Sequence, residues 1–414
     1  MRFLVLVLVP VLGAVWSVDV TAQGVPRATT VSERERSEFD PTGIQLGGLR
    51  LFPALGVEYR SDSNIFATAE NEIEDSIWVG EPSLILRSDW SRHAFEVGTR
   101  VNSARHDEVE SEDYDDSFGW VAGRVDLNRQ QISAHIEQGN MHEERTSPND
   151  QGGIVPTEFV SDSFSVSYRY QPAQFFFTVD AYARQLDYKD TLTLAGRENN
   201  DDRDETNVDV GVRVGHEVSD SYSLFAEARS NSNEYDQLVD DDGFARSSDG
   251  YEVLLGATVD LSGSTYGEIH LGYRETEYDD ERFQTVDGFT FDLDFIWNVS
   301  GLTSIQLSGG REINSTTIVG VSGIEATSLD LAIEHELRRN LILRFDASLL
   351  NEKFQGSPRD DSVRAVGLNA EYMVNRRLSL FLGLEAEGRE TSPLDAGGFE
   401  YSKRWITLRL EGRI

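Results

Sequence analysis

The sequence contains no cysteine, which excludes disulfide bonds and thiolate metal sites and suits an oxidising compartment. Basic residues are scarce: 37 Lys and Arg stand against 73 Asp and Glu among 414 residues, and the formal net charge is -36. Nucleic-acid binding needs a cationic surface, so we expect no nucleic-acid partner. Beyond residue 22 the chain also lacks any run of about 18 apolar residues, the length that a helix needs to cross a bilayer.

The long apolar stretch that is present lies at the N-terminus. Arg2 supplies a positive charge, Phe3 to Trp16 is nearly all apolar, and Val20-Thr21-Ala22 offers a small-residue cleavage site. We interpret residues 1–22 as a secretory signal peptide, with an uncleaved anchor helix as the alternative. Residues 23–50 are polar and charge-mixed and predict a periplasmic N-terminal tail. Whether this tail folds inward as a plug is left open by the sequence.

The last stretch, Tyr401 to Ile414, predicts the fold of the remaining chain, residues 51–414. Apolar and charged residues alternate along it, so one face of an extended strand is apolar and the other is polar. A strand at the chain terminus must pair backwards, and pairing with the first strand would remove both sheet edges. We therefore expect an all-β fold, a transmembrane antiparallel up-and-down barrel with lipid outside and a wet lumen inside.

The rest of the chain repeats one pattern of strand, long acidic loop, strand and short turn. Short turns fall at intervals of about 40 residues, for example at Gln171 to Gln174 and Arg338 to Asn340. Long loops such as Lys189 to Asp202 alternate with them. This asymmetry of loop length is typical of outer-membrane barrels and predicts about 18 strands (16 to 18), with both termini on the periplasmic side. A soluble sandwich is the alternative, but it would rarely contain so many strands.

The first predicted hairpin, Gly56 to Phe66 and Pro82 to His93, resembles an outer-membrane β-barrel porin family of the porin-2 type. The segment Asp62-Ser63-Asn64-Ile65-Phe66 is similar to that family's D-x-N-I/V-F motif, and the repeat layout matches from about Leu51 to Ile414. The resemblance implies a porin-like channel in a Gram-negative outer membrane. Because members are often associated with exopolysaccharide loci, it also implies a role as the pore for exopolysaccharide export. The chain ends in Ile414, whereas such barrels commonly end in an aromatic residue.

The polar strand positions are the candidate functional residues because they would face the lumen, where rings of charge select among solutes. Acids outnumber bases among them, so we expect a cation preference, which conflicts with export of an anionic polysaccharide. The alternative is that these groups are simply paired across neighbouring strands. The predicted lumen residues are Glu96, Arg100, Arg124, Asp126, Asp209, Arg213, Glu227, Arg229, Asp292, Asp294, Arg344, Asp346, Glu385, Glu387, Arg409 and Glu411.

No metal, cofactor or catalytic site is expected. The acidic runs Asn199 to Glu205 and Asp240 to Gly243 lack the ligand spacing of a calcium loop and are interpreted as solvated loop tips, with divalent bridging to lipopolysaccharide as the alternative. The histidines form no helical metal pair, and the sequence has no nucleophile elbow, so an enzyme is not expected.

Three functions remain, in order of preference. The first is an outer-membrane channel, the second is a non-conducting structural or surface-interaction barrel with a plugged lumen, and the third is a barrel hydrolase. The expected partners are outer-membrane lipid and lipopolysaccharide, the outer-membrane assembly machinery and, for an exporter, polysaccharide and periplasmic export components.

Overall fold

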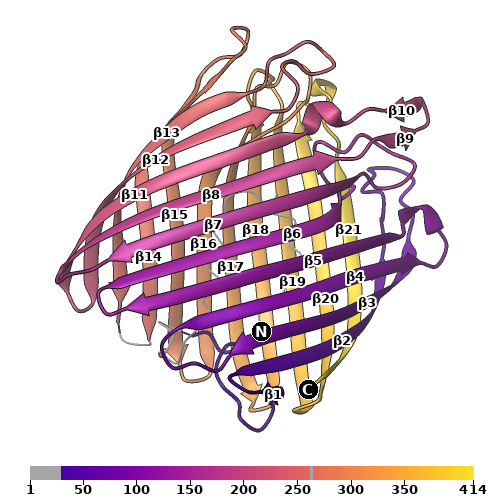
Figure 1. Ribbon diagram of the computed structural model, residues 1–414. Coiled ribbons are helices and arrows are strands. Elements are labelled where there is room, and N and C mark those ends of the chain that lie inside the picture. Colours follow the sequence, from indigo (N-terminus) through magenta and orange to yellow (C-terminus); the bar gives the residue numbers. More distant parts are fainter. Residues whose placement is uncertain (1–28, 262–263) are drawn as a thin grey trace.

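The computed structural model describes residues 29–261 and 264–414, so the predicted signal peptide lies outside the described residues. Antiparallel strands close into a barrel of 18 strands, which confirms the predicted fold and strand number (Figure 1). Closure occurs where the first barrel strand pairs with the last, from Ala54 opposite Arg413 to Asp62 opposite Trp405. Within the described ranges, no helix is long and apolar enough to cross a membrane.

The barrel strands follow one another around the ring in sequence order, and β8 pairs directly with β11. They are β2 (Leu49–Asp62), β3 (Asp75–Ser88), β4 (Ala94–His106), β5 (Tyr114–Leu127), β6 (Gln130–His142), β7 (Glu158–Tyr170), β8 (Phe175–Tyr188), β11 (Glu205–Ser219), β12 (Tyr222–Tyr235), β13 (Ser248–Asp260), β14 (Thr265–Tyr278), β15 (Val286–Ser300), β16 (Thr303–Asn314), β17 (Ile324–Arg338), β18 (Leu341–Phe354), β19 (Asp360–Asn375), β20 (Leu378–Ser392) and β21 (Tyr401–Arg413).

The two ends of the barrel differ. Short turns join strands at one end, here called the short-turn end, where both termini of the described chain also lie (Figure 1). One turn needs Asn128 in the left-handed conformation, with φ of 59°, which asparagine tolerates better than most residues. At the opposite, long-loop end, the connections carry three single-turn 3₁₀ helices and a small hairpin. These are η1 (Glu110–Glu112), η2 (Asp201–Arg203), η3 (Leu394–Ala396), β9 (Thr191–Thr193) and β10 (Gly196–Glu198).

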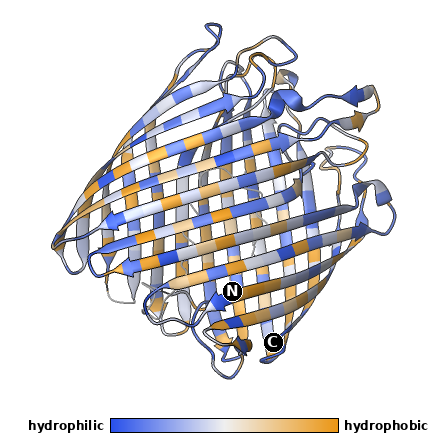
Figure 2. Ribbon diagram, viewed as in Figure 1, coloured by the Kyte–Doolittle hydropathy of each residue, from blue (hydrophilic) through white to orange (hydrophobic). Residues whose placement is uncertain are grey.

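Side chains alternate between the outer and inner faces of the barrel wall. On β11 the outward Val208, Val210, Val212 and Val214 are exposed, whereas the intervening residues turn inward. Figure 2 shows this alternation of apolar and polar positions along the strands. Because strand side chains alternate with a period of two, each strand presents an apolar face to lipid and a polar face to the lumen.

A short strand precedes the barrel. β1 (Ile44–Leu46) pairs with the start of β2, with Ile44 opposite Leu51. The tight hairpin between them contains Gly47 with φ of 66°, in the left-handed region that glycine adopts without strain. This hairpin lies at the short-turn end and anchors the residues before it to the barrel rim (Figure 1).

Candidate functional site: the lumen

The inner faces of the strands form the candidate site. All the residues predicted to line the lumen lie on these inner faces, between the outward apolar residues of their strands. They do not gather in one cluster, because they come from strands distributed around the whole ring. Their environments therefore differ from strand to strand.

Most arginines of the inner wall are paired with carboxylates, either of their own strand or of nearby strands. Arg213 lies 2.8 Å from Glu227 and 2.7 Å from Glu268, and Arg229 also contacts Glu227. Arg344 lies 3.0 Å from Glu334 and 2.7 Å from Asp346. These pairs cancel much of the positive charge that the arginines would otherwise present to a solute.

Further ion pairs involve β21 at the barrel seam and β5. Arg409 lies 2.9 Å from Glu81 and 2.8 Å from Glu411, and Arg124 lies 3.1 Å from Asp126. The sequence left open whether such groups pair across strands. Arg409 does so with Glu81 of β3, whereas its pair with Glu411 and the pair of Arg124 with Asp126 lie within one strand. Glu96 is also satisfied, since it accepts hydrogen bonds from Arg87 at 2.7 Å and from the Trp120 indole at 2.8 Å.

The acids of β15, β16 and β17 have a different environment. Asp292, Glu312 and Asp330 make no ion pair within 4 Å among the residues that the structure describes, and both Asp292 and Asp294 are exposed. The strand register places Asp294 opposite Ser308 and Ser308 opposite Asp330, while Asp292 lies opposite Gly310. Small side chains of β16 therefore lie beside the two exposed acids of β15, and Ser308 separates Asp294 from Asp330.

We call Asp292, Asp294, Glu312 and Asp330 the acidic strip. The sequence predicted the two acids of β15 but missed the other two. Asp330 lies between Ser328 and Ala332, a weakly polar inner face that gives little signal in the sequence. On the β16 side the acids of β15 lie beside the small residues Ser308 and Gly310, and only the pairing register brings these together.

At the long-loop end the loops fold inward over the mouth. Asn64, in the motif identified from the sequence, is fully buried and donates its side-chain amide to the carbonyls of Thr68 at 2.7 Å and Ser402 at 3.0 Å. The next residue, Ile65, packs against Ile77 and Val79 on the inner wall. The motif therefore holds the loop between β2 and β3 against the inside of the barrel.

Buried ion pairs tie neighbouring loops together. Arg145 lies 2.7 Å from Glu112, and Arg203 lies 2.8 Å from Glu143, with all four side chains nearly inaccessible. A buried charge pair of this kind is costly to break, because removing one partner leaves the other charge unpaired. The loops between β4 and β5, β6 and β7, and β8 and β11 are thus joined into one layer.

Other contacts cross the mouth. The Thr316 hydroxyl donates to the Asn149 side-chain oxygen at 2.7 Å, which joins the loop after β16 to the loop after β6, from a distant part of the ring. Ser315 donates to Glu205 at 2.8 Å, and Arg246 donates to the Thr316 and Val321 carbonyls at 2.7 Å. The loops therefore span the mouth and do not stand away from it.

These contacts correct one expectation from the sequence. The acidic run beginning at Asp240 is not merely a solvated tip, because the Asp240 carboxylate is buried against Arg246. Nearby, burial and the adjacent acids Asp187 and Asp201 raise the pKa of Asp204 to about 6, although the Tyr188 amide donates to it. Within the described residues, no group of three or more His, Asp or Glu has a geometry that could hold a metal ion.

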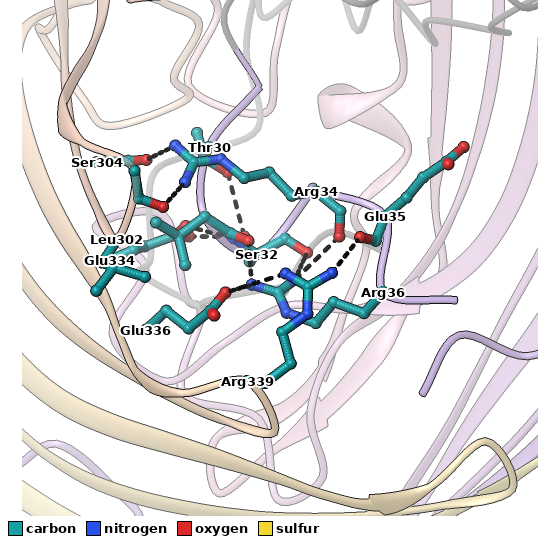
Figure 3. A network of polar contacts seen from close by, with 12 residues as sticks. Thr30, Ser32, Arg34, Glu35, Arg36, Leu302, Ser304, Glu334, Glu336 and Arg339 are labelled. Atoms are coloured by element: carbon teal, nitrogen blue, oxygen red, sulfur yellow. Dashed lines mark hydrogen bonds and ion pairs between the residues drawn. The ribbon is translucent and has the colours of Figure 1, made fainter. Parts of the chain in front are cut away.

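At the short-turn end, residues 29–40, here called the N-terminal segment, lie inside the mouth (Figure 3). The Ser32 amide and hydroxyl both donate to Glu334 at 2.8 Å. Arg36 pairs with Glu336 at 3.0 Å, and their side chains are only 2% and 9% exposed. The sequence left open whether the N-terminal tail folds inward, and residues 29–40 of it do so.

Two apolar side chains of the N-terminal segment complete this contact. Val31 is fully buried against Ile342 and Met373, with Phe39 packed beside them. All of these wall contacts lie on the inner faces of β15 to β21, so the segment follows only one side of the rim.

No match to a curated protein was found. Among solved structures, the chain is similar to OpdL of Pseudomonas aeruginosa, at 9% identity over 89% of this chain and 99% of that chain with a TM-score of 0.44. It is also similar to the outer membrane protein OpdK of Pseudomonas aeruginosa, at 12% identity over 88% and 99% with a TM-score of 0.43.

A third similar structure is the ferric citrate transporter FecA in the unliganded form, at 8% identity over 91% of this chain and 79% of that chain, with a TM-score of 0.45. The family described as "Putative beta-barrel porin 2" matches residues 36–413, which is the full barrel together with part of the N-terminal segment. The chain therefore belongs to this family of outer-membrane β-barrel porins.

Proposed function

We propose that the protein is a cation-favouring channel through the outer membrane of a Gram-negative bacterium. The short-turn end and both termini face the periplasm, and the long loops face outward, as the loop asymmetry predicts. Lipid and lipopolysaccharide surround the apolar outer wall, and the outer-membrane assembly machinery inserts it. The acidic strip is the observation that carries the proposed selectivity.

The charges of the inner wall are the basis of the proposed selectivity. The inner-wall arginines of β11, β12 and β18 are paired with carboxylates, whereas Asp292, Glu312 and Asp330 make no ion pair among the described residues. Carboxylates that face lumen water, as those of the exposed Asp292 and Asp294 and the half-buried Asp330 do, attract cations and repel anions. The preference should grow at low salt, because the Debye length increases from about 10 Å at 0.1 M to about 30 Å at 0.01 M.

The same field limits the exporter hypothesis. An exopolysaccharide that carries carboxylates would be repelled along the acidic strip, so export is compatible with this wall only for an uncharged polymer. Passage of a polymer would also require the loops at one mouth and the N-terminal segment at the other to move aside.

The contacts across the outer mouth favour a second candidate, a non-conducting barrel that acts through its surface. The hydrogen bond between Thr316 and Asn149 and the buried Arg246 hold the loops over the lumen. A barrel whose loops never open would conduct no ions and would present the loop layer to external partners. Conductance separates this candidate from the channel.

The test is a planar-bilayer measurement of reversal potential across a KCl gradient. The triple variant Asp292→Asn, Asp294→Asn, Asp330→Asn should lose most of the cation preference of the wild type, and the loss should be larger at low salt. The matched control Asp249→Asn, Glu277→Asn removes acids from the outer wall, and its selectivity should stay that of the wild type.

An anion-selective wild type, or equal effects of the two variants, would contradict the proposed role of the acidic strip. Absence of any conductance would favour the non-conducting barrel.

A further inference from the structure

We propose that the N-terminal segment is a reversible stopper that narrows the periplasmic mouth from the side of β15 to β21 and is released when the channel opens. This inference rests on the proposed channel function and concerns how the channel is regulated. Four features of the segment support it: its internal folding, the state of the wall groups that it contacts, its connection to the barrel, and its position relative to the acidic strip.

The segment is folded on itself, so it can move as one body. The Phe39 amide donates to the Arg36 carbonyl at 2.7 Å, and the Glu33 amide donates to the Thr30 carbonyl at 3.2 Å. The Arg36 guanidinium donates back to the Val31 carbonyl at 2.6 Å. These bonds stay within the segment and would survive its departure from the wall.

The two wall carboxylates that bind the segment each have a second partner within the wall. Glu334 also accepts from Arg344 at 3.0 Å, and Glu336 lies 3.7 Å from Arg339. Leaving a buried carboxylate without a counter-charge is strongly unfavourable, and release of the segment leaves neither one in that state.

The uncharged side chain of Asn298 also has a second partner within the wall. The Asn298 side-chain oxygen accepts from Arg34 of the segment at 2.7 Å and from the Ser304 hydroxyl of the wall at 2.6 Å. At the rim, Arg376 donates to the Ser37 carbonyl at 2.9 Å, and water can replace this contact. These polar groups of the docking site therefore keep a partner both with and without the segment, and release exposes the apolar contact that Val31 makes with Ile342 and Met373.

The connection to the barrel allows movement. Residues 41–43 join the N-terminal segment to β1, which the pairing with β2 holds in place. Gly43 has φ of 65°, and a Cβ there would come within 2.6 Å of the Arg50 side chain. A glycine can absorb a large backbone rotation at such a joint, so this residue is the natural hinge.

The position of the segment links it to conduction. Asn298 and Ser304, which contact Arg34, lie on β15 and β16, the strands that carry Asp292, Asp294 and Glu312. The docked segment therefore lies at the periplasmic end of the acidic strip, where cations following the strip would leave the lumen.

A tether tests the stopper directly, because the chain has no cysteine of its own. Val31 and Met373 belong to one apolar cluster, so the double variant Val31→Cys, Met373→Cys places a thiol on the segment and another on the wall, and a disulfide or a short crosslinker that dithiothreitol cleaves can join them and hold the segment docked. Single-channel recordings should then show only the low-conductance level under oxidising conditions, and dithiothreitol should restore transitions to a higher level. The single variants Val31→Cys and Met373→Cys are the matched controls and should not respond to dithiothreitol.

A second variant that lacks residues 29–40 should lose the low-conductance level and remain cation-selective. If this deletion and the oxidised tether both conduct as the wild type does, the stopper is wrong while the channel stands. If the deletion conducts without cation preference, the acidic strip has failed as the selective element. Lack of conductance in every variant, despite correct folding on heat-modifiability gels, would overturn both proposals.

Discussion

The lipid-facing assignment of the outer wall makes a prediction that depends on depth. On β18 and β19 the outward apolar band is centred near the register pair Phe345 and Leu368, and the Leu368 side chain is 58% exposed. An arginine on the lipid face costs about 2–4 kcal/mol at the bilayer midplane and about 0–1 kcal/mol near the interfaces. We therefore expect Leu368→Arg to lower the free energy of unfolding by about 2–4 kcal/mol.

Two further substitutions make this prediction specific. Asn369 is the next residue on the strand and lies at nearly the same depth, but it faces inward and donates to Asp346 at 3.2 Å. Asn369→Arg should cost little, because the new charge meets water and a carboxylate. Leu343 lies two residues from Phe345, about 5 Å closer to the short-turn edge for strands tilted by about 40°, so Leu343→Arg should have an intermediate effect.

The assay is equilibrium unfolding by urea of each variant refolded into lipid vesicles, with folding followed by the shift of the heat-modifiable band. Equal destabilisation by Leu368→Arg and Asn369→Arg would show that the two wall faces do not meet different solvents, and the barrel would not span a membrane as described. Equal effects of Leu368→Arg and Leu343→Arg would contradict the position of the apolar band.

Two other expectations concern the loops. Epitope tags inserted at Asn199 and at Asp220 should label on intact cells only at Asn199, because the first lies in a long loop and the second in a short turn; the reverse pattern would invert the topology. The Asp204 carboxyl has its pKa raised to about 6, so it binds its proton more tightly in the folded loop than in the released one. Closure of this loop should strengthen as the pH falls from 7 towards 5 and weaken as the pH rises through 6, which limited proteolysis of the loop can follow. Asp204→Asn keeps an acceptor for the Tyr188 amide and should remove the pH dependence; a variant as pH-sensitive as the wild type would place the titration elsewhere.

The sequence predicts the barrel wall well because the relevant physics is local. Alternation along a strand decides which face is apolar, so Asp209 and Val210 could be assigned to opposite faces without any knowledge of their neighbours. The short turns and long loops likewise depend on residues that are consecutive in the sequence. The strand number followed from their spacing alone.

The closure of the two mouths could not be predicted in the same way. The partner of Asn149 is Thr316, and the partner of Ser32 is Glu334, so both contacts join residues far apart in sequence. Nothing near Ser32 indicates which distant carboxylate it meets, because that depends on the register of every intervening strand. Asp330 was missed for a related reason, since the side chain beside it, Ser308, belongs to the adjacent strand.

The family motif also bears on how the barrel is completed during assembly. Asp62 lies 3.1 Å from Lys403, the Ser63 amide donates to the Arg404 carbonyl at 3.0 Å, and Asn64 donates to the Ser402 carbonyl. Three consecutive residues at the end of the first barrel strand thus bond to the strand that is synthesised last. Before β21 is in place, Asn64 and its neighbours lack these partners. The first barrel strand therefore has unpaired polar groups until the last one binds to it. The bonds of the motif across the seam therefore stabilise the closed barrel. An open sheet would lack them, and its free edges could pair with another chain.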